Sequence, residues 1–225
     1  MLAEALAAGV EPEAIYVTAA GSAGLPAAAA AIDPARVYEI PERAMARLSE
    51  LEHPPGILAV FPMALADLES VLGSGEPAVV LAGVGDPGNA GTLLRSAEIF
   101  GLRGAIFLPG AVEAFNPKVV RAAMGATFRL RLAVADGPAL VAAAARHGYT
   151  LIAAVRGGEP LPDFRFPERA LIAIGHERHG VAESLPRYDR AVAIPHRGAG
   201  ESLNAAVAGG IIFYAFSQQV RTINF

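Results

Sequence analysis

The chain has 225 residues, 53% of them hydrophobic, which is enough for a packed core in one large domain or two small ones. Zero cysteines exclude disulfides, thiolate metal sites and a cysteine nucleophile, and a net charge of −4 argues against a protein that coats nucleic-acid phosphates without specificity. No apolar run is long enough to span a membrane and acidic residues interrupt the start of the chain, so we expect a soluble cytoplasmic protein.

The first 63 residues predict a small α/β region. Its helices are expected at 2–8 and 42–49, and its strands at 14–17, 37–39 and 57–61. The region is small for an independent domain and begins inside what resembles a helix, so we interpret it as part of a longer module. Residues 64–76, which end in Gly-Ser-Gly, predict a linker with one helical stretch.

From residue 77 the pattern changes to alternating apolar strands and helices. The expected strands are 78–84, 105–108, 128–133, 150–154, 170–174 and 191–194, and the expected helices lie near 88–100, 117–124, 138–147 and 202–219. Continuous apolar strands separated by helices predict an α/β fold, with a mostly parallel sheet covered on both faces, over residues 77–225. Ligands of such sheets bind beyond the carboxyl ends of the strands, here in the loops after Val84, Leu108, Ile174 and Ile194.

The loop after the first of these strands carries a formal G-x-G-x-x-G at Gly83, Gly85 and Gly88, which makes a dinucleotide-binding oxidoreductase one alternative. Pro87 weakens this alternative, because it removes a backbone N–H where a pyrophosphate needs donors. The next strand also ends in Leu-Pro-Gly, without an acidic residue placed for a ribose.

The helix that follows carries Asn89, Gly91 and Arg95. Arg95 comes directly after two leucines in an apolar helix, so we expect it to be half-buried and held in place. A guanidinium out of water needs a partner, and a structural salt bridge to Asp86 or Glu98 is the alternative to a functional role.

A second polar loop, Gly175-His176-Glu177-Arg178-His179-Gly180, comes directly after a buried strand. The two glycines allow close backbone approach, and Glu177 is presented at the carboxyl end of the strand. The two histidines invite a metal hypothesis, but no third ligand stands at a useful spacing, so no metal is expected.

The third loop runs from Ile194 through Pro195 and Gly198 to Ser202, Leu203 and Asn204, and leads into an apolar helix. Ser202 is expected to cap that helix, because its hydroxyl can accept from the unpaired N–H groups of the first turn. The helix is almost wholly apolar over residues 205–216, so we expect it to be buried on most sides.

Together the three blocks resemble the SpoU family of RNA ribose 2′-O-methyltransferases, in the SPOUT superfamily. The resemblance covers residues 77–217 well. Upstream, residues 2–18 and 55–60 more weakly resemble the later parts of a substrate-binding domain that is similar to small ribosomal RNA-binding proteins, and its first portion is expected to be missing. Arg178, and Ala205-Ala206 where Val-Ser is frequent, depart from the family pattern. The matching positions are Asn89, Gly91, Arg95 and Ala97, then Gly175, Glu177 and Gly180, then Ile194, Pro195, Gly198, Ser202, Leu203 and Asn204, with Ala208, Gly210 and Tyr214 in the last helix.

The resemblance implies a C-terminal deep trefoil knot that binds S-adenosylmethionine, and an obligate homodimer packed through the knot region. It implies methyl transfer to a ribose 2′-hydroxyl of RNA, ribosomal RNA rather than transfer RNA. Arg95 is then the catalytic residue, either orienting the hydroxyl and a phosphate or, if strongly desolvated, acting as base. The residues expected to position the ribose and Arg95 are Asn89, Glu177, Ser202 and Asn204, and those expected at the cofactor are Gly175, Ile194 and Leu203, with Leu108 and Gly110 nearby. A catalytically silent knotted RNA-binding dimer is the alternative from another class.

Overall fold

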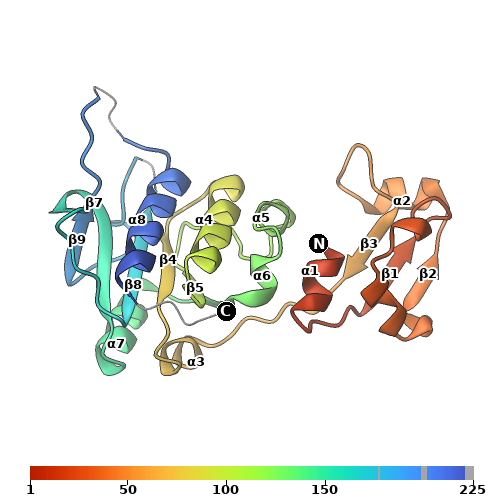
Figure 1. The fold of residues 1–225 in the computed structure, drawn as a ribbon, viewed down its shortest axis with the longest axis horizontal. Helices are drawn as coiled ribbons and strands as arrows, with labels where there is room; N and C mark the ends of the chain where they lie inside the picture. The colour runs from red at the N-terminus through yellow and green to blue at the C-terminus, as the bar shows by residue number, and fades with distance from the viewer. Residues whose placement is uncertain (177, 199–201, 221–225) are drawn as a thin grey trace. The chain divides into compact units, whose positions relative to one another are not determined.

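The computed structural model describes residues 1–176, 178–198 and 202–220. Clustering of the backbone divides the chain into two compact units, Met1–Ala64 and Leu65–Phe225. Figure 1 labels the helices and strands of both units. None of the helices that the structure describes is long and apolar enough to cross a membrane.

The first unit is built on a three-stranded sheet with the order β2-β1-β3, in which β2 is parallel and β3 antiparallel to β1. Ile15 and Val17 point from β1 to one face of the sheet and form a small core with Leu2. The three strands and both α-helices lie where the sequence predicts them. The elements are α1 (Leu2–Ala7), β1 (Ala14–Val17), β2 (Val37–Glu39), α2 (Glu42–Leu48) and β3 (Ile57–Val60), with short 3₁₀ helices at Ser22–Gly24, Ala27–Ala31 and Pro34–Arg36.

The second unit contains a six-stranded sheet with the order β6-β5-β4-β8-β7-β9, and every neighbouring pair is parallel. The expected α/β fold with a mostly parallel sheet is thereby confirmed. The strands are β4 (Ala78–Ala82), β5 (Gly104–Phe107), β6 (Arg131–Val134), β7 (Thr150–Pro160), β8 (Ala170–Gly175) and β9 (Arg190–Ala193).

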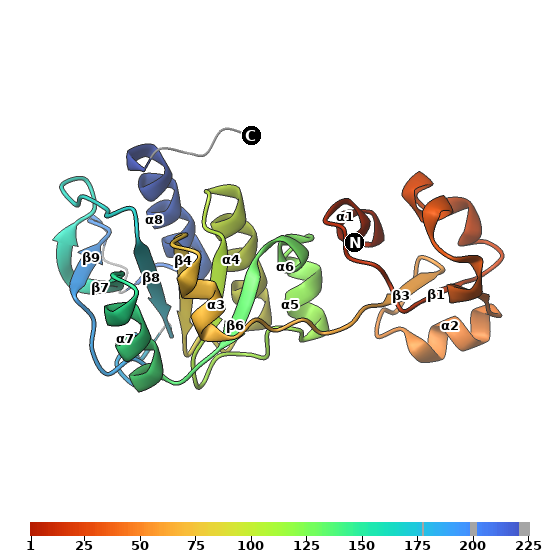
Figure 2. The same ribbon diagram turned by 90° about the horizontal axis from the view of Figure 1, so that it is seen from below.

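Helices cover both faces of this sheet, with α4 and α8 on one face and α3 and α7 on the other (Figure 2). Alternate residues of β4 serve the two layers: Val79 and Leu81 belong to the core under α4 and α8, whereas Val80 belongs to the core under α3 and α7. The helices are α3 (Leu68–Gly73), α4 (Pro87–Ile99), α5 (Pro117–Ala122), α6 (Ala126–Arg129), α7 (Gly137–Arg146) and α8 (Ala205–Gln219).

Three segments differ from the sequence prediction. Residues 128–129, expected to begin the strand 128–133, instead end α6, because Met124 and Gly125 adopt positive φ values of 49° and 94° and restart the chain as a new helix. Strand β7 runs on to Pro160, six residues past its expected end. Within the stretch expected as a linker, α3 buries Val71 and Leu72 in the second unit.

Candidate functional site

The first motif begins at the N-terminus of α4, where β4 delivers the chain to the carboxyl edge of the sheet. The Asp86 carboxylate accepts a hydrogen bond from the Asn89 N–H at 2.7 Å and caps the helix, and Pro87 occupies its first position, which needs no N–H donor. Gly91 lies in the interface between α4 and α5. A Cβ there would stand 2.5 Å from the Ala122 Cβ and 2.6 Å from the Val119 oxygen. Glycine therefore lets the two helices approach closely and fixes where α4 lies.

Arg95 lies on the exposed side of α4, about 9 Å along the helix axis from Asn89. The expected half-burial is wrong, because the buried stripe of α4 runs through Leu93, Leu94 and Ala97 and leaves position 95 outside it. The salt-bridge alternative fails as well. Glu98 pairs with Arg129 at 2.9 Å, and Arg95 forms no ion pair in the part of the chain that the structure describes. Arg95 is an accessible cation.

The third motif places Asn204, and not Ser202, at the N-cap of α8. The Asn204 side-chain oxygen accepts from the Ala206 N–H at 2.9 Å and the Val207 N–H at 3.2 Å. The prediction for Ser202 is wrong, because the N-cap lies two residues further along the chain and the Ser202 hydroxyl caps no helix. Ser202 is exposed. Asparagine and serine are comparable caps, so sequence alone did not rank them.

The other end of the Asn204 amide joins two of the sequence motifs. Its Nδ2 donates to the Oδ1 of Asn89 at 2.9 Å, across 115 positions of sequence. This one side chain therefore caps α8 and ties the start of α8 to the start of α4.

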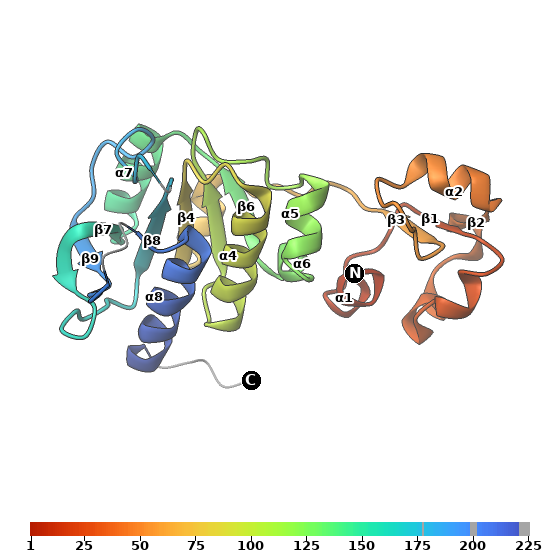
Figure 3. The same ribbon diagram turned by 90° about the horizontal axis from the view of Figure 1, so that it is seen from above.

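Further contacts keep α4 and α8 side by side along their length (Figure 3). A Cβ on Gly209 would stand 2.2 Å from the Leu93 Cδ2, and the rings of Phe100 and Tyr214 meet edge to face at 5.8 Å between centroids. Partners at 89 and 204, 93 and 209, and 100 and 214 keep a nearly constant separation in sequence, so the two helices run parallel and both begin at the carboxyl edge of the sheet.

The second motif forms a closed turn at the end of β8. The backbones of His176 and Gly180 exchange two hydrogen bonds of 3.0 and 2.9 Å. Gly180 has a φ of 64°, and a Cβ on Gly175 would stand 2.3 Å from the Gly180 carbonyl carbon. Both glycines are therefore required by the turn itself. Glu177 lies outside the described residues, so its predicted role stays a prediction.

The residues expected at the cofactor lie along the carboxyl edge of the sheet, from β5 to β9. Leu108 is buried at the end of β5, Gly175 ends β8 and pairs with Ala82 of β4, and Ile194 directly follows β9. The loops after β4 and β5 touch, since a Cβ on Gly110 would stand 3.4 Å from the Gly83 Cα.

This edge offers unpaired backbone donors. Within the described residues, the N–H groups of Gly110 and Leu203 donate no hydrogen bond, and the Leu203 side chain is 42% exposed. Free N–H groups beside an exposed apolar side chain suit a ligand with both polar and apolar parts.

The two histidines of the second motif do not form a metal centre. Their rings lie 4.8 Å apart, but the Nδ1 of His176 accepts from the Arg178 N–H, and His179 pairs with Glu183 at 3.3 Å. Among the residues that the structure describes, no group of three potential metal ligands is found. No metal was expected from the sequence.

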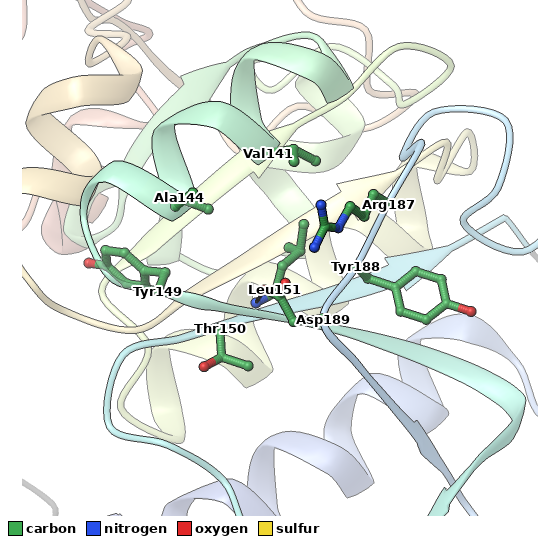
Figure 4. A pocket seen from close by; sticks show the side chains of 9 residues that line it. Val141, Ala144, Tyr149, Thr150, Leu151, Arg187, Tyr188 and Asp189 are labelled. Carbon is green, nitrogen blue, oxygen red and sulfur yellow. Dashed lines mark hydrogen bonds between the residues drawn. The ribbon is translucent and has the colours of Figure 1, made fainter.

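A pocket of about 260 Å³ lies at the opposite end of the sheet, between α7 and the segment before β9 (Figure 4). Two of its polar side chains are engaged in the fold: Asp189 accepts from the Leu151 N–H, and the Tyr149 hydroxyl donates to the Glu76 carbonyl. Burial raises the pKa of that hydroxyl. None of the predicted site residues lines this pocket, and parallel sheets do not bind ligands at the amino ends of their strands. The candidate site is the carboxyl edge.

One feature of the site was missed by the sequence analysis. Helix α8 is not buried on most sides, since Val207, Ile211 and Tyr214 are 51%, 39% and 54% exposed. They lie at i, i+4 and i+7 on one face, and Ile99 of the neighbouring α4 is also exposed. A helix that is apolar all round carries no periodic signal for which face is covered, so the sequence offered no way to find this stripe.

A doubly covered parallel sheet with loops gathered at its carboxyl edge defines the unit as a ligand-binding α/β domain of the kind that carries enzymes. Residues 76–214 match the model of the SpoU rRNA Methylase family. The chain belongs to this family.

Two curated relatives illustrate the similarity. The chain is 32% identical to the Bacillus subtilis 23S rRNA (guanosine(2553)-2′-O)-methyltransferase RlmP, over 79% of this chain and 71% of the relative. It is also 32% identical to a 23S rRNA (uridine(2479)-2′-O)-methyltransferase of Streptomyces viridochromogenes, over 75% of this chain and 62% of that protein.

Solved structures agree with the sequence comparison. The SpoU methyltransferase AviRb of Streptomyces viridochromogenes superimposes with a TM-score of 0.80 at 25% identity, covering 97% of this chain and 86% of that one. An RNA 2′-O ribose methyltransferase matches with a TM-score of 0.74 at 26% identity, covering 97% and 85%. Both alignments include the first unit, which the family model leaves out.

Proposed function

We propose that this chain transfers a methyl group from S-adenosylmethionine to a ribose 2′-hydroxyl in RNA. The observation that carries the proposal is the hydrogen bond between Asn89 and Asn204, because it joins the first and third motifs beside the free backbone donors of the carboxyl edge. Arg95 stands exposed on one of the two helices that this bond connects. Family membership and the names of the relatives support the same reaction.

The residues of the carboxyl edge fit S-adenosylmethionine. Gly110 and Leu203 would hold its polar groups through their free N–H donors, and the Leu203 side chain offers an apolar contact. When bound, the cofactor supplies a methyl group that its sulfonium centre has already activated.

The remaining work of the protein is to orient the hydroxyl and assist loss of its proton. Arg95 carries a permanent charge in water, so we assign it first to orienting the hydroxyl and a neighbouring phosphate. It acts as a base only where desolvation is strong. Asn89 and Asn204 are positioning residues, because their amides bind one another and the helix start.

The substrate we propose is ribosomal RNA. The two relatives reported above are named for 23S rRNA, and the family carries rRNA methylation in its description. We also propose that residues 1–63 serve as the partial substrate-binding domain, joined through residues 64–76 to the methyltransferase domain 77–225. The solved RNA methyltransferases that cover both units support this division.

We further propose a homodimer that covers the exposed stripe of α8. Val207, Ile211 and Tyr214, with Ile99 of α4, form an apolar surface on the same two helices that carry Asn89 and Arg95. A second copy on this surface would take water away from Arg95, which is the condition for a base role. The trefoil knot stays a prediction from the family resemblance.

Calorimetric titration of the purified protein with S-adenosylmethionine tests the proposal without a guess at the RNA. Binding near one cofactor per subunit, followed by 2′-O-methylation of unmodified 23S rRNA transcript, is the expected result. A folded dimer that binds no cofactor would contradict an active enzyme and favour the silent RNA-binding dimer.

Replacement of Arg95 by Ala separates chemistry from binding. We expect the rate to fall by roughly 10²- to 10⁴-fold, because the variant loses the group that orients the hydroxyl. Cofactor affinity should change little, since Arg95 is not among the residues proposed at the cofactor. An equal loss of cofactor affinity would make Arg95 a structural residue instead.

A further inference from the structure

At the carboxyl edge of three adjacent strands of the second unit, the turn after β8, the irregular stretch inside β7 and the segment after β9 each carry one exposed arginine. These arginines are Arg178 in the turn after β8, Arg156 in β7 beyond Ala154, and Arg197 after β9. Ala153 is paired with Ala173 of β8 and Ala154 with Val192 of β9, so the three strands reach the edge at one level. Because neighbouring strands lie about 4.8 Å apart, the three loops emerge within about 10 Å of one another.

The backbone around Arg156 has a specified shape. The register between β7 and β9 shifts from Ala154 to Glu159, so residues 155–158 leave the ladder as a bulge. A Cβ on Gly158 would stand 2.6 Å from both the N and the carbonyl C of Val192, so only glycine fits there. Bulges of this kind occur beside active sites, where they redirect a side chain. This bulge carries Arg156 out of the sheet at the edge that holds the candidate site.

Within the described residues these three arginines are unpaired, as Arg95 is, whereas several other cations of the unit pair with carboxylates. Arg146 at the amino edge pairs with Glu69, and Arg190 pairs with Glu159 at 2.8 Å. Within the described residues, Arg156, Arg178 and Arg197 form no ion pair.

The acids described near these arginines are already engaged. Glu159 pairs with Arg190, and Glu183 with His179. Solvated cations that cluster beside engaged acids form an anion-binding surface.

The first unit carries little of this positive charge. Residues 1–64 contain eight acidic side chains against three arginines and no lysine. A protein that holds RNA needs cations on the phosphates, because these contacts provide most of the sequence-independent affinity. The second unit holds the other 15 of the 18 lysines and arginines, so it offers most of the cations for such contacts.

We propose that Arg156, Arg178 and Arg197 bind the phosphates that flank the methylated nucleotide. The proposal rests on the proposed function and names the surface that holds its RNA. These are positioning residues: they fix the register of the RNA backbone over the carboxyl edge, and they take no part in the chemistry. Arg156 is the centre of the set because β7 lies between β8 and β9.

The test compares Arg156→Gln with Arg187→Gln, which removes the same charge from an exposed arginine at the opposite, amino edge of the sheet. Methylation of unmodified 23S rRNA transcript with labelled S-adenosylmethionine gives kcat and the KM for RNA over a series of salt concentrations. We expect Arg156→Gln to raise the KM for RNA about three- to tenfold and to reduce the slope of log KM against log salt by about 0.7, the loss of one phosphate contact. The Arg187→Gln variant should behave as the parent.

Two further measurements keep the test decisive. Arg156→Lys keeps the positive charge but lacks the planar guanidinium, so it should restore the slope of log KM against log salt seen in the parent. If Arg156→Gln does not fold, Arg178→Gln should show the same rise in the KM for RNA. A parent protein that methylates nothing would refute the proposed function. An active parent in which Arg156→Gln and Arg187→Gln behave alike, or in which Arg156→Gln weakens cofactor binding as much as RNA binding, would overturn the present inference alone.

Discussion

Replacing Gly91 with Ala tests whether close packing of α4 on α5 sets the position of the catalytic helix. The new Cβ would stand 2.5 Å from the Ala122 Cβ, 2.6 Å from the Val119 oxygen and 2.9 Å from the Ala123 nitrogen. Carbon atoms in contact prefer about 3.5–4 Å, so the helices must part by about 1 Å. Two of the three obstructing atoms are backbone and cannot turn aside.

The expected cost follows from two opposing terms. Overpacking of this kind destabilises by about 1–3 kcal/mol. Alanine in a helix interior recovers up to about 1 kcal/mol relative to glycine. With the full helix gain subtracted, the net loss is up to about 2 kcal/mol, which lowers Tm by up to roughly 8 °C in a protein of this size.

Gly210→Ala is the matched control, because it makes the same change in the interior of α8. Its Cβ would meet only the Ser96 Oγ at 3.8 Å, an ordinary contact. The helix-propensity gain then stands alone, and we expect a stabilisation of about 0.5–1 kcal/mol.

Urea unfolding followed by circular dichroism, at one protein concentration, measures both variants. Gly91→Ala should also lower kcat under conditions where it is fully folded, since α4 carries Arg95 away from its place. If Gly91→Ala and Gly210→Ala stabilise the protein alike, the α4–α5 approach described here is wrong.

Three further predictions concern other contacts of the second unit. Asn204→Ala should lower the free energy of unfolding in urea by about 0.5–2 kcal/mol, because the cap of α8 is lost. Asn204→Asp keeps the cap and should lose only the hydrogen bond donated to Asn89. Equal losses of stability in the two variants would show that the cap does not stabilise the helix. Ile211→Asp should convert the proposed dimer to monomers in light scattering, and an unchanged mass would remove α8 from the interface. The hydrogen bond from His147 holds the pKa of Glu69 below its ordinary value. The contact therefore stabilises the folded state at pH values above the pKa that Glu69 has in the unfolded chain. This stabilisation is lost as the pH falls through the lower pKa of Glu69 in the folded state. In Glu69→Gln the free energy of unfolding should therefore fall less steeply as the pH is lowered, and an unchanged dependence on pH would contradict this.

The sequence was most informative about the sheet. Apolar runs such as 78–82 and 170–174 have few alternatives to a buried parallel strand, and both were found within a residue or two of their expected ends. Residues 128–129 were also expected in a strand, but there the positive φ values of Met124 and Gly125 decide in favour of a helix. The backbone conformation of these two residues determines the helix, and the hydrophobic pattern does not predict it.

The site was predictable in position but not in exposure. Motif spacing placed Asn89 and Asn204 at one edge of the sheet, and the structure brings them into contact. Whether Arg95 is covered depends on which face of α4 meets α5 and α8, and that is set by the small residues Gly91 and Gly209. The bulge that carries Arg156 depends on register between β7 and β9, which no local pattern encodes.

The packing of α8 on α4 also has a consequence for synthesis of the chain. Ile212, Phe213 and Phe216 complete the same core layer as Leu93 and Ala97, although they are translated well after α4. Until they emerge, the apolar side of α4 has no cover. Since a domain folds as a unit during synthesis, this layer can close only after α8 has been translated. A nascent chain that stalls before the N-cap of α8 would therefore expose the apolar side of α4, which favours aggregation, and would lack Asn204 at the candidate site.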